Sequence, residues 1–285
     1  MGVQPTSISV VPSRARRELT ENSAAVMSQR QPGVFFTIND SGNDPILFAM
    51  DTSGADRGAW RVRGAENVDW ESGSMGPCAP NVADKGCIYV GDTGDNMADH
   101  ATRSIYRVRE PDARGETDSI DAERLTYVYA DGPHDVEAMY VAPTGDLFLI
   151  TKRRLTGATG MLRPALVFRL PPGAWGVRDT ITAQLVDSLA IVPGSSPLRS
   201  ITDASLAPDG RHLAVRTYSQ LFVFDTDSAT GRVNRAQRPS ICNIVVLGEA
   251  QGEGVTWMSS RGRFLFTSEG QTEPIRLADC PLPAR

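Results

Sequence analysis

One short sequence pattern recurs five times along this chain: a polar or acidic residue, a short apolar run, a turn and a second apolar run. The third residues of the copies are Ser23, Asp69, Glu137, Thr202 and Glu253, which are 46, 68, 65 and 51 residues apart. Repeats of about 50 residues with several short strands each are typical of β-propellers, in which one repeat forms one blade. We therefore predict an all-β fold, a five-bladed β-propeller.

The apolar runs within the repeats are short, rich in β-branched and aromatic residues, and bounded by Gly, Pro, Asp or Asn, as strands are. Ile244-Val245-Val246 is predicted as a strand of the fourth repeat. Residues 111–121 and 155–164 are predicted as insertions that lengthen two repeats. Helix should be scarce.

The fifth repeat lacks one strand, which residues 8–11 (Ile-Ser-Val-Val) can supply from the N-terminus. Adding this strand to the last blade joins both chain ends in one sheet and removes an exposed edge. Six blades are the alternative, but they need a sixth repeat that we do not find. We predict one domain over residues 1–285, with blades at approximately 20–64, 65–131, 132–188, 198–248, and 249–280 plus 7–12.

Charge and hydropathy exclude two classes of partner. The net charge of −5 and the pI near 5.3 argue against nucleic acid, because binding phosphates needs a basic surface. No apolar run approaches the roughly 18 residues of a membrane span. Met1-Gly2 leads straight into polar residues, so a signal peptide is absent from this sequence, either removed or never there. We expect a monomer that acts on a small molecule.

The four cysteines indicate the compartment. Cys78 and Cys87 flank a loop whose ends can meet, and a disulfide there is stable in an oxidising compartment. The alternative is two free thiols in a cytosolic protein. Cys242 and Cys280 either pair or stay free, and the sequence leaves that open. No CxxC spacing supports a zinc site. We predict a secreted or periplasmic protein.

Polar residues at the strand ends identify one end of the propeller channel as the candidate site. The first and second strands of a blade are antiparallel, so the start of the first and the end of the second lie at the same end. The second-strand ends carry Asp40, Asp92, Lys152, Arg216 and Glu269, among others. The first-strand starts carry the remaining candidates: Glu21, Asn67, Asp69, Asp135, Glu137, Asp203, Gln251 and Glu253.

So many carboxylates need a counter-charge to remain ionised close together. Lys152, Arg153 and Arg216 can supply part of it, and Ca²⁺, which takes about six to eight oxygen ligands, can supply more. Mg²⁺ is the alternative ion, although it prefers fewer protein ligands. The expected metal ligands are Asp69, Glu137 and Glu253, with Glu21, Asn67 and Asp92 as further candidates. Strand-end Asp and Asn also cap turns without any metal, and for Asp95 and Asn96 both roles stay open.

His134 is the histidine next to this cluster, beside Asp135, and is a candidate general base. Lys152 or Arg216 could stabilise developing negative charge. The catalytic candidates are therefore His134, Asp135, Lys152 and Arg216.

Several motifs in order resemble a family of secreted or periplasmic bacterial β-propellers. They are Asn39-Asp40-Ser41-Gly42, Asp69-Trp70-Glu71 and Gly91-Asp92-Thr93-Gly94-Asp95-Asn96, within a resemblance that spans about residues 18–275. Separately, Gly252-Glu253-Gly254 with Val255-Thr256-Trp257 resembles the metal-binding segment of the calcium-dependent propeller hydrolases: gluconolactonases, paraoxonases and organophosphate hydrolases. This second resemblance implies a metal-dependent hydrolase.

Our leading hypothesis is a calcium-dependent hydrolase of ester-like bonds, either phosphotriester, phosphodiester or lactone, with the metal as Lewis acid. A second hypothesis is a non-catalytic binding propeller of the cell envelope with a structural ion. A third is a glycosidase, which needs two spaced carboxylates from Asp69, Asp135 and Glu253. Its sugar platforms would be aromatic: Trp70, Tyr140, Tyr218 and Trp257.

Overall fold

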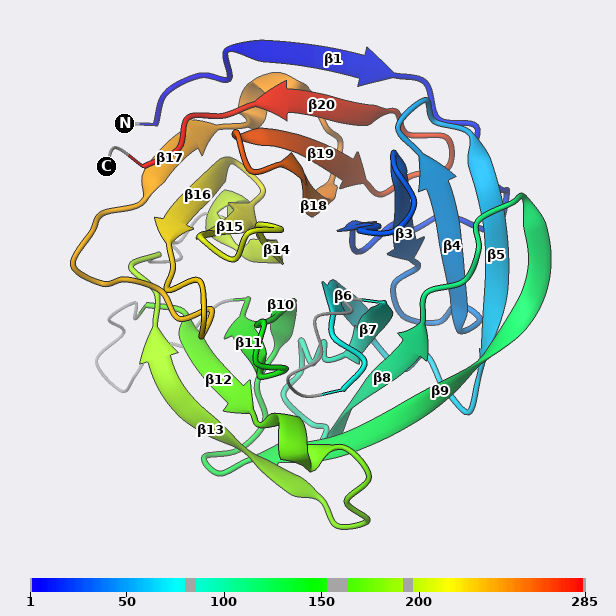
Figure 1. Ribbon diagram of the computed structural model, residues 1–285, viewed down its shortest axis with the longest axis vertical. Helices are drawn as coiled ribbons and strands as arrows, with labels where there is room; N and C mark the ends of the chain where they lie inside the picture. The colour runs from blue at the N-terminus through cyan, green and yellow to red at the C-terminus, as the bar shows by residue number, and fades with distance from the viewer. Residues whose placement is uncertain (1, 80–85, 153–163, 192–196, 284–285) are drawn as a thin grey trace.

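The computed structural model describes residues 2–79, 86–152, 164–191 and 197–283, and nearly all regular structure in these ranges is β-strand. Antiparallel pairing joins the strands into groups of four, set around a common axis with one strand of each group innermost (Figure 1). This arrangement confirms the prediction of an all-β propeller.

Each group of four strands is called a blade below. Blade one contains β2 (Val26–Met27), β3 (Val34–Ile38), β4 (Ile46–Asp51) and β5 (Asp56–Arg63). Blade two contains β6 (Trp70–Gly76), β7 (Cys87–Asp92), β8 (Arg103–Arg109) and β9 (Glu116–Tyr129). Blade three contains β10 (Val136–Val141), β11 (Leu147–Thr151), β12 (Leu166–Leu170) and β13 (Ile181–Ser188).

Blade four contains β14 (Ile201–Leu206), β15 (His212–Thr217), β16 (Gln220–Asp225) and β17 (Ser240–Asn243). Blade five contains β18 (Gly252–Ser259), β19 (Arg263–Ser268), β20 (Ile275–Asp279) and, from the other end of the chain, β1 (Ser7–Val11). Three 3₁₀ turns complete the described structure: η1 (Pro172–Ala174), η2 (Pro197–Arg199) and η3 (Val245–Leu247). No helix among the described residues is long and apolar enough to cross a membrane.

The N-terminal strand completes blade five, as the missing strand of the last repeat indicated. β1 runs antiparallel to β20, with Ile8 opposite Ala278. The two ends of the chain therefore lie close together at one side of the ring (Figure 1). This pairing closes the ring non-covalently.

The prediction of a strand at Ile244-Val245-Val246 is wrong. β17 ends at Asn243, and Val245–Leu247 form η3 instead. The side-chain oxygen of Asn243 accepts the N–H of Val245, which turns the chain out of the sheet. Val245 and Val246 are both more than half exposed.

β9 connects three blades at the outer rim. Its residues Glu116–Asp121 pair in parallel with β5, and Tyr127–Tyr129 pair in parallel with β13. Part of segment 111–121 is therefore strand rather than insertion, because β5 of the preceding blade offers it a free edge. Most of the second predicted insertion, residues 155–163, lies outside the described residues.

The hydrophobic core is divided among the spaces between neighbouring blades. Each cluster of buried side chains draws on two adjacent blades; Trp70, Ile88 and Tyr106 of blade two, for example, pack with Phe36 and Leu47 of blade one. The other four clusters are likewise each shared between two adjacent blades. The inner strands are held by packing on both faces, which gives the channel residues a rigid frame.

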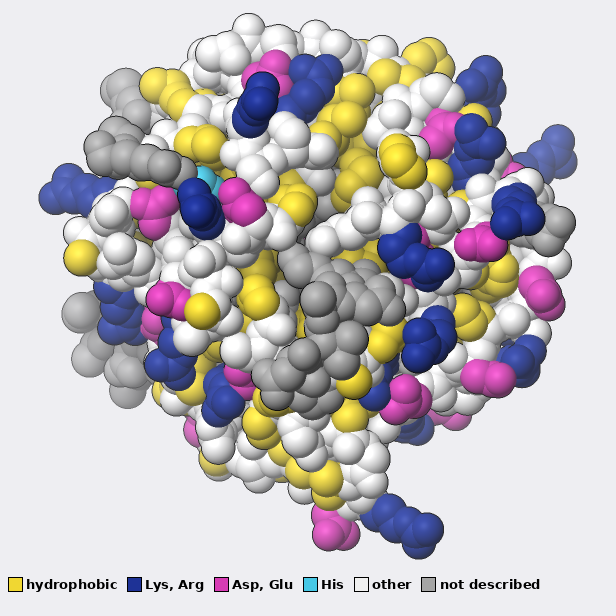
Figure 2. Space-filling model, in the orientation of Figure 1, with side chains coloured by type: hydrophobic (Ala, Val, Ile, Leu, Met, Phe, Trp, Pro, Cys, Tyr) yellow, Lys and Arg dark blue, Asp and Glu magenta, His cyan; other side chains and the backbone are white. Residues whose placement is uncertain are grey.

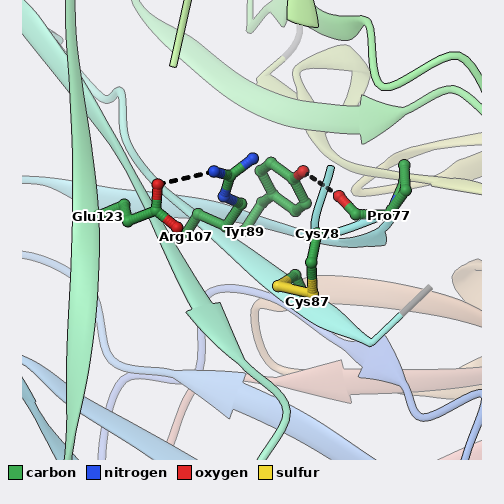
Figure 3. Close-up of a disulfide and its surroundings, with 6 residues drawn as sticks. All are labelled: Pro77, Cys78, Cys87, Tyr89, Arg107 and Glu123. Atoms are coloured by element: carbon green, nitrogen blue, oxygen red, sulfur yellow. Dashed lines mark hydrogen bonds and ion pairs between the residues drawn. A yellow bond between two sulfur atoms is a disulfide. The ribbon is translucent and has the colours of Figure 1, made fainter. Parts of the chain in front are cut away.

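Both cysteine pairs form disulfides. Cys78–Cys87 joins the segment after β6 to the start of β7, beside a buried Tyr89 whose hydroxyl donates to the carbonyl of Pro77 (Figure 3). Cys242–Cys280 joins β17 of blade four to the end of β20 in blade five. The first pair was predicted, and the second settles the alternative that the sequence left open.

Candidate metal centre

The innermost strands begin with a local irregularity in the same place in four blades. The register of pairing shifts around Glu71, Glu137, Thr202 and Glu253, where the first strand carries extra residues relative to its partner. Such bulges redirect a side chain that would otherwise follow the strand alternation. Three of the four positions hold glutamate, and all three glutamates are buried.

One close group of three carboxylates comes from blades one and two. Oxygens of Asp40, Asp69 and Glu71 lie within 4.8 Å of one another. Ser23 of blade one donates a 2.6 Å hydrogen bond to Glu71 Oε2. Asp40 follows β3 and Glu71 opens β6, so the group forms where two neighbouring blades meet.

The backbone around Asp69 is held by blade two itself. The N–H groups of Thr93 and Gly94 both donate to the carbonyl of Asp69. A Cβ atom on Gly94 would stand 2.6 Å from Asp69 Oδ2 and 2.6 Å from Glu71 Cγ. Glycine is therefore required for the two carboxylates to approach this loop.

Glu137 and Lys152 form a buried ion pair beside this group. Lys152 Nζ donates to Glu137 Oε1 at 2.6 Å, and the two side chains are 15% and 2% exposed. Burial opposes the charge on Lys152, but the Glu137 carboxylate outweighs it and raises the pKa of the lysine. Lys152 therefore keeps a positive charge among the carboxylates, as predicted from its place after β11.

Two more carboxylates at this end of the channel belong to Asp135 and Glu253. Each has one buried oxygen, Asp135 Oδ2 and Glu253 Oε2, that accepts no hydrogen bond from the described residues. The other oxygen of each is used, because Asp95 N–H donates to Asp135 Oδ1 and the Tyr218 hydroxyl donates to Glu253 Oε1 at 2.9 Å. An unpaired carboxylate oxygen in the interior is costly. A cation would remove that cost.

The electrostatics show that these groups form one cluster. Burial, with repulsion from Glu137 and Asp40, raises the pKa of Glu71 well above its usual value. Burial, with repulsion from Asp40, raises the pKa of Asp69 to about 6. Burial and the Glu253 carboxylate raise the pKa of Glu269 to about 7. We call this set the acidic cluster: Asp40, Asp69, Glu71, Asp135, Glu137, Glu253 and Glu269.

Arg216 is not available to a substrate. Its side chain is fully buried, its Nη1 donates to the carbonyls of Gly254 and Thr267, and its Nη2 pairs with Glu249. This burial does not favour the predicted role of Arg216 in stabilising charge on a substrate. The bulge at the start of β18 leaves these carbonyls unpaired in the sheet, and the guanidinium satisfies them.

His134 is not a member of the acidic cluster, and the position of its ring does not favour the predicted role of general base. Its ring packs against Tyr129 and Phe168, at 4.9 and 4.8 Å between centroids. Its Nε2 lies 3.0 Å from Asp131. Side chains of adjacent residues in an extended chain point in opposite directions. The Asp135 side chain points toward the acidic cluster, so the His134 side chain points away from it.

Two of the three further metal candidates, Asn67 and Asp92, have structural roles. Asp92 Oδ1 accepts the N–H of Asp69, and Arg103 lies 3.5 Å from the same oxygen. Asn67 donates to the carbonyls of Asn39 and Asp40 and accepts from Trp70 N–H. Asn67 and Asp92 thus position the cluster without facing it.

Glu21, the third, is exposed and accepts from Asn43 at 2.6 Å, so it lies at the rim. Asp203 is fully buried, and its Oδ2 accepts the N–H of Val255, which ties β14 to β18. Asp95 accepts N–H groups from Asp99 and His100, which caps this turn, and its carboxylate also lies within 4.8 Å of donor atoms of the Asp99 and His100 side chains. Arg153 lies outside the described residues.

The aromatic residues considered as sugar platforms are mostly in the core. Trp70, Tyr140 and Trp257 are at most 2% exposed. Tyr218 is partly exposed and touches the cluster through Glu253. This distribution does not favour a glycosidase.

No protein-family model and no curated protein matches this chain. Among solved structures, the glutaminyl cyclase of Myxococcus xanthus resembles it with a TM-score of 0.53 at 14% identity, covering 99% of this chain and 100% of that one. The major allergen Mala s 1 of Malassezia sympodialis gives 0.52 at 9% identity, covering 95% and 96%. The shared fold is the β-propeller. Identities this low carry no activity across.

Glu71 is the member of the cluster that sequence reasoning did not assign. The third residue of the repeated pattern in blade two is Asp69, whereas the bulge position of that blade is Glu71, two residues later. The signal was present, because Asp69-Trp70-Glu71 places acidic residues at both positions. Deciding between them required the pairing of Trp70 with Asp92.

Proposed function

We propose that this chain is a Ca²⁺-dependent hydrolase of ester-like bonds, phosphoester or lactone, acting at the acidic end of its propeller channel. The observation that carries the proposal is the convergence of Asp40, Asp69 and Glu71 oxygens within 4.8 Å. Around them lie buried carboxylate oxygens, on Asp135 and Glu253, that lack a hydrogen-bond donor among the described residues.

The ligand chemistry favours a hard divalent ion. Ligands on opposite sides of Ca²⁺ stand about 5 Å apart, given metal–oxygen distances of about 2.3–2.6 Å, which the 4.8 Å group can meet. Three carboxylates offer up to six oxygens. The cluster contains no cysteine or histidine, so it is unsuited to zinc or copper. Mg²⁺ is the alternative ion.

A bound ion of this kind supplies Lewis-acid chemistry toward a carbonyl or phosphoryl oxygen. The chain's own residues would hold and balance the remaining charges. Lys152 can stabilise negative charge that develops on the substrate, at the cost of its contact with Glu137. Glu269 is half-buried with a pKa near 7, so it can accept a proton from water.

The fold and the disulfides support an exported enzyme. The M. xanthus neighbour shows that a chain of this architecture can be an enzyme, a glutaminyl cyclase in that case. Two disulfides persist in oxidising compartments, which supports a secreted or periplasmic location.

The test is turnover of chromogenic phosphotriesters, phosphodiesters and lactones, with a glutaminyl peptide and glycosides in the same panel, each with chelator and with Ca²⁺. We expect hydrolysis of one ester class that chelator abolishes and Ca²⁺ restores. Asp69→Asn should lose it, while the exposed Asp118→Asn, with the same change of charge, should keep it. Turnover unchanged by chelator would rule the mechanism out. Stabilisation by Ca²⁺ without turnover of any substrate would identify a binding propeller instead.

A further inference from the structure

The opposite end of the channel has a different chemistry from the acidic cluster. The innermost strands run from their acidic starts toward a cavity of about 230 Å³ at their other ends. Three methionines line it, Met27 of β2, Met75 of β6 and Met258 of β18. Figure 2 shows the molecule in the orientation of Figure 1, with hydrophobic side chains exposed at several places around the middle of this face.

The three methionines come from strands that lie side by side. Met27 N–H donates to Thr256 Oγ1 at 3.0 Å, which joins β2 to β18 two residues before Met258. On the other side, a Cβ atom on Gly73 would stand 2.7 Å from Val26 Cγ2, so β6 and β2 are in close contact two residues before Met75. Each methionine is partly exposed, as expected for side chains that face the cavity.

Three of the hydroxyl groups in this lining already make hydrogen bonds. The Ser28 hydroxyl donates to Glu110, Ser74 Oγ accepts from Val141 N–H, and Thr256 Oγ1 accepts from Met27 N–H. No Asp, Glu, His or Cys is among the described residues that line the cavity. The described lining thus offers a cation three thioether sulfurs, beside the amide of Gln29 and the hydroxyls, and no carboxylate, imidazole or thiolate.

A negative charge lies directly behind this lining. Glu110 is 5% exposed and bonds through Oε1 to Ser28 and to Gln31, each at 2.6 Å. Its Oε2 is buried and accepts no hydrogen bond from the described residues. The charge of Glu110 would be balanced by a monovalent cation held in the cavity.

We infer that Met27, Met75 and Met258 form a binding site for a soft monovalent ion, Cu⁺, at the channel end opposite the acidic cluster. Thioether ligands select Cu⁺ over hard divalent ions. All four cysteines of the chain are in disulfides, so they offer no thiolate to compete for the ion. The two ends of the channel thus suit two classes of metal.

The experiment uses Ag⁺, a redox-inert substitute for Cu⁺, and the intact chain labelled with [methyl-¹³C]methionine. The chain has eight methionines. The first equivalent of Ag⁺ should shift the methyl signals of Met27, Met75 and Met258 together, each assigned from its Met→Leu variant. Met97, which is 82% exposed, and Met139, which is fully buried, are the controls and should not move at that concentration.

A competition titration with Cu⁺, ascorbate and bicinchoninate measures the affinity. We expect one ion per chain, loss of binding in Met75→Leu, and a decrease of about tenfold in Glu110→Gln, which leaves the sulfurs in place. Met97→Leu should bind as the unchanged chain does. If the three methyl signals do not move together ahead of Met97, or if Met75→Leu binds Cu⁺ with unchanged affinity, the inference is wrong.

Discussion

Lys152 Nζ lies 2.6 Å from Glu137 Oε1, and this pair joins the end of β11 to the bulge that opens β10. The same ammonium also acts on Asp135 and Glu71, so one lysine balances carboxylates from two blades. The single positive charge of Lys152 is smaller than the combined negative charge of these carboxylates. The acidic cluster is therefore short of positive charge.

Replacing the lysine should destabilise the protein when divalent ions are absent. Lys152→Met leaves Glu137 buried and unpaired, which should lower the free energy of unfolding by about 3 kcal/mol in chelator. Urea denaturation measures it. Arg61→Met breaks an ion pair that is more than half exposed on both sides and should cost less than about 1 kcal/mol. Equal losses in the two variants would contradict the structure.

Calcium should stabilise the folded chain through the acidic cluster. At about 100 times its dissociation constant a ligand adds about 2.7 kcal/mol, which thermal unfolding in Ca²⁺ and in chelator can detect. Glu71→Gln should remove most of this gain, since Glu71 belongs to the 4.8 Å group. Asp118→Asn, which removes an exposed charge, should retain it. A full gain in Glu71→Gln would place the ion elsewhere.

Without divalent ions, stability should fall as the pH rises. The pKa values of Asp69 and Glu269 are raised to about 6 and about 7 from 3.8 and 4.5. Between these values the folded chain binds more protons than the unfolded chain, so Tm in chelator should decrease from about pH 5 to about pH 8. Saturating Ca²⁺ should flatten this slope. A Tm that increases over the same range would contradict the raised pKa values.

The two disulfides should contribute unequally. Cys242–Cys280 spans 38 residues and Cys78–Cys87 spans 9. Loop entropy then predicts losses of about 4 and about 2.5 kcal/mol on replacing each pair by alanine. Urea denaturation of the two double variants compares them. The reverse order would show that loop length does not decide their contribution.

His134 should be dispensable for any activity. His134→Gln removes ring contacts with Tyr129 and Phe168 and should cost about 1 kcal/mol of stability. Turnover and the response to Ca²⁺ should not change. Loss of turnover with stability intact would restore the histidine as a catalytic candidate.

Much of the architecture followed from local sequence. The apolar runs predicted most strands, the short fifth repeat predicted the pairing of β1 with β20, and the cysteine spacing predicted Cys78–Cys87. The strand ends also located Lys152, Asp40 and Glu269 at the acidic end. Each of these predictions depends on residues within one repeat or on a missing strand.

The assignments that the structure does not favour depended on contacts that side chains make in the folded chain. Arg216 is a cation at a strand end, as predicted, but Glu249 and two carbonyls beside it occupy the guanidinium. His134 adjoins Asp135 in sequence and faces the other way. For both residues, the neighbouring sequence does not predict which groups the side chain contacts in the folded chain.

The sequence by itself determined that the chain is an all-β repeat protein with acidic strand ends, because strand alternation, turn residues and repeat spacing are local properties. The tertiary structure alone decided which acidic side chains meet. The bulge at the start of β6 leaves Glu71 without a paired residue on β7, and its carboxylate lies in the same group as those of Asp40 and Asp69. Such a bulge exists only once β6 and β7 have paired.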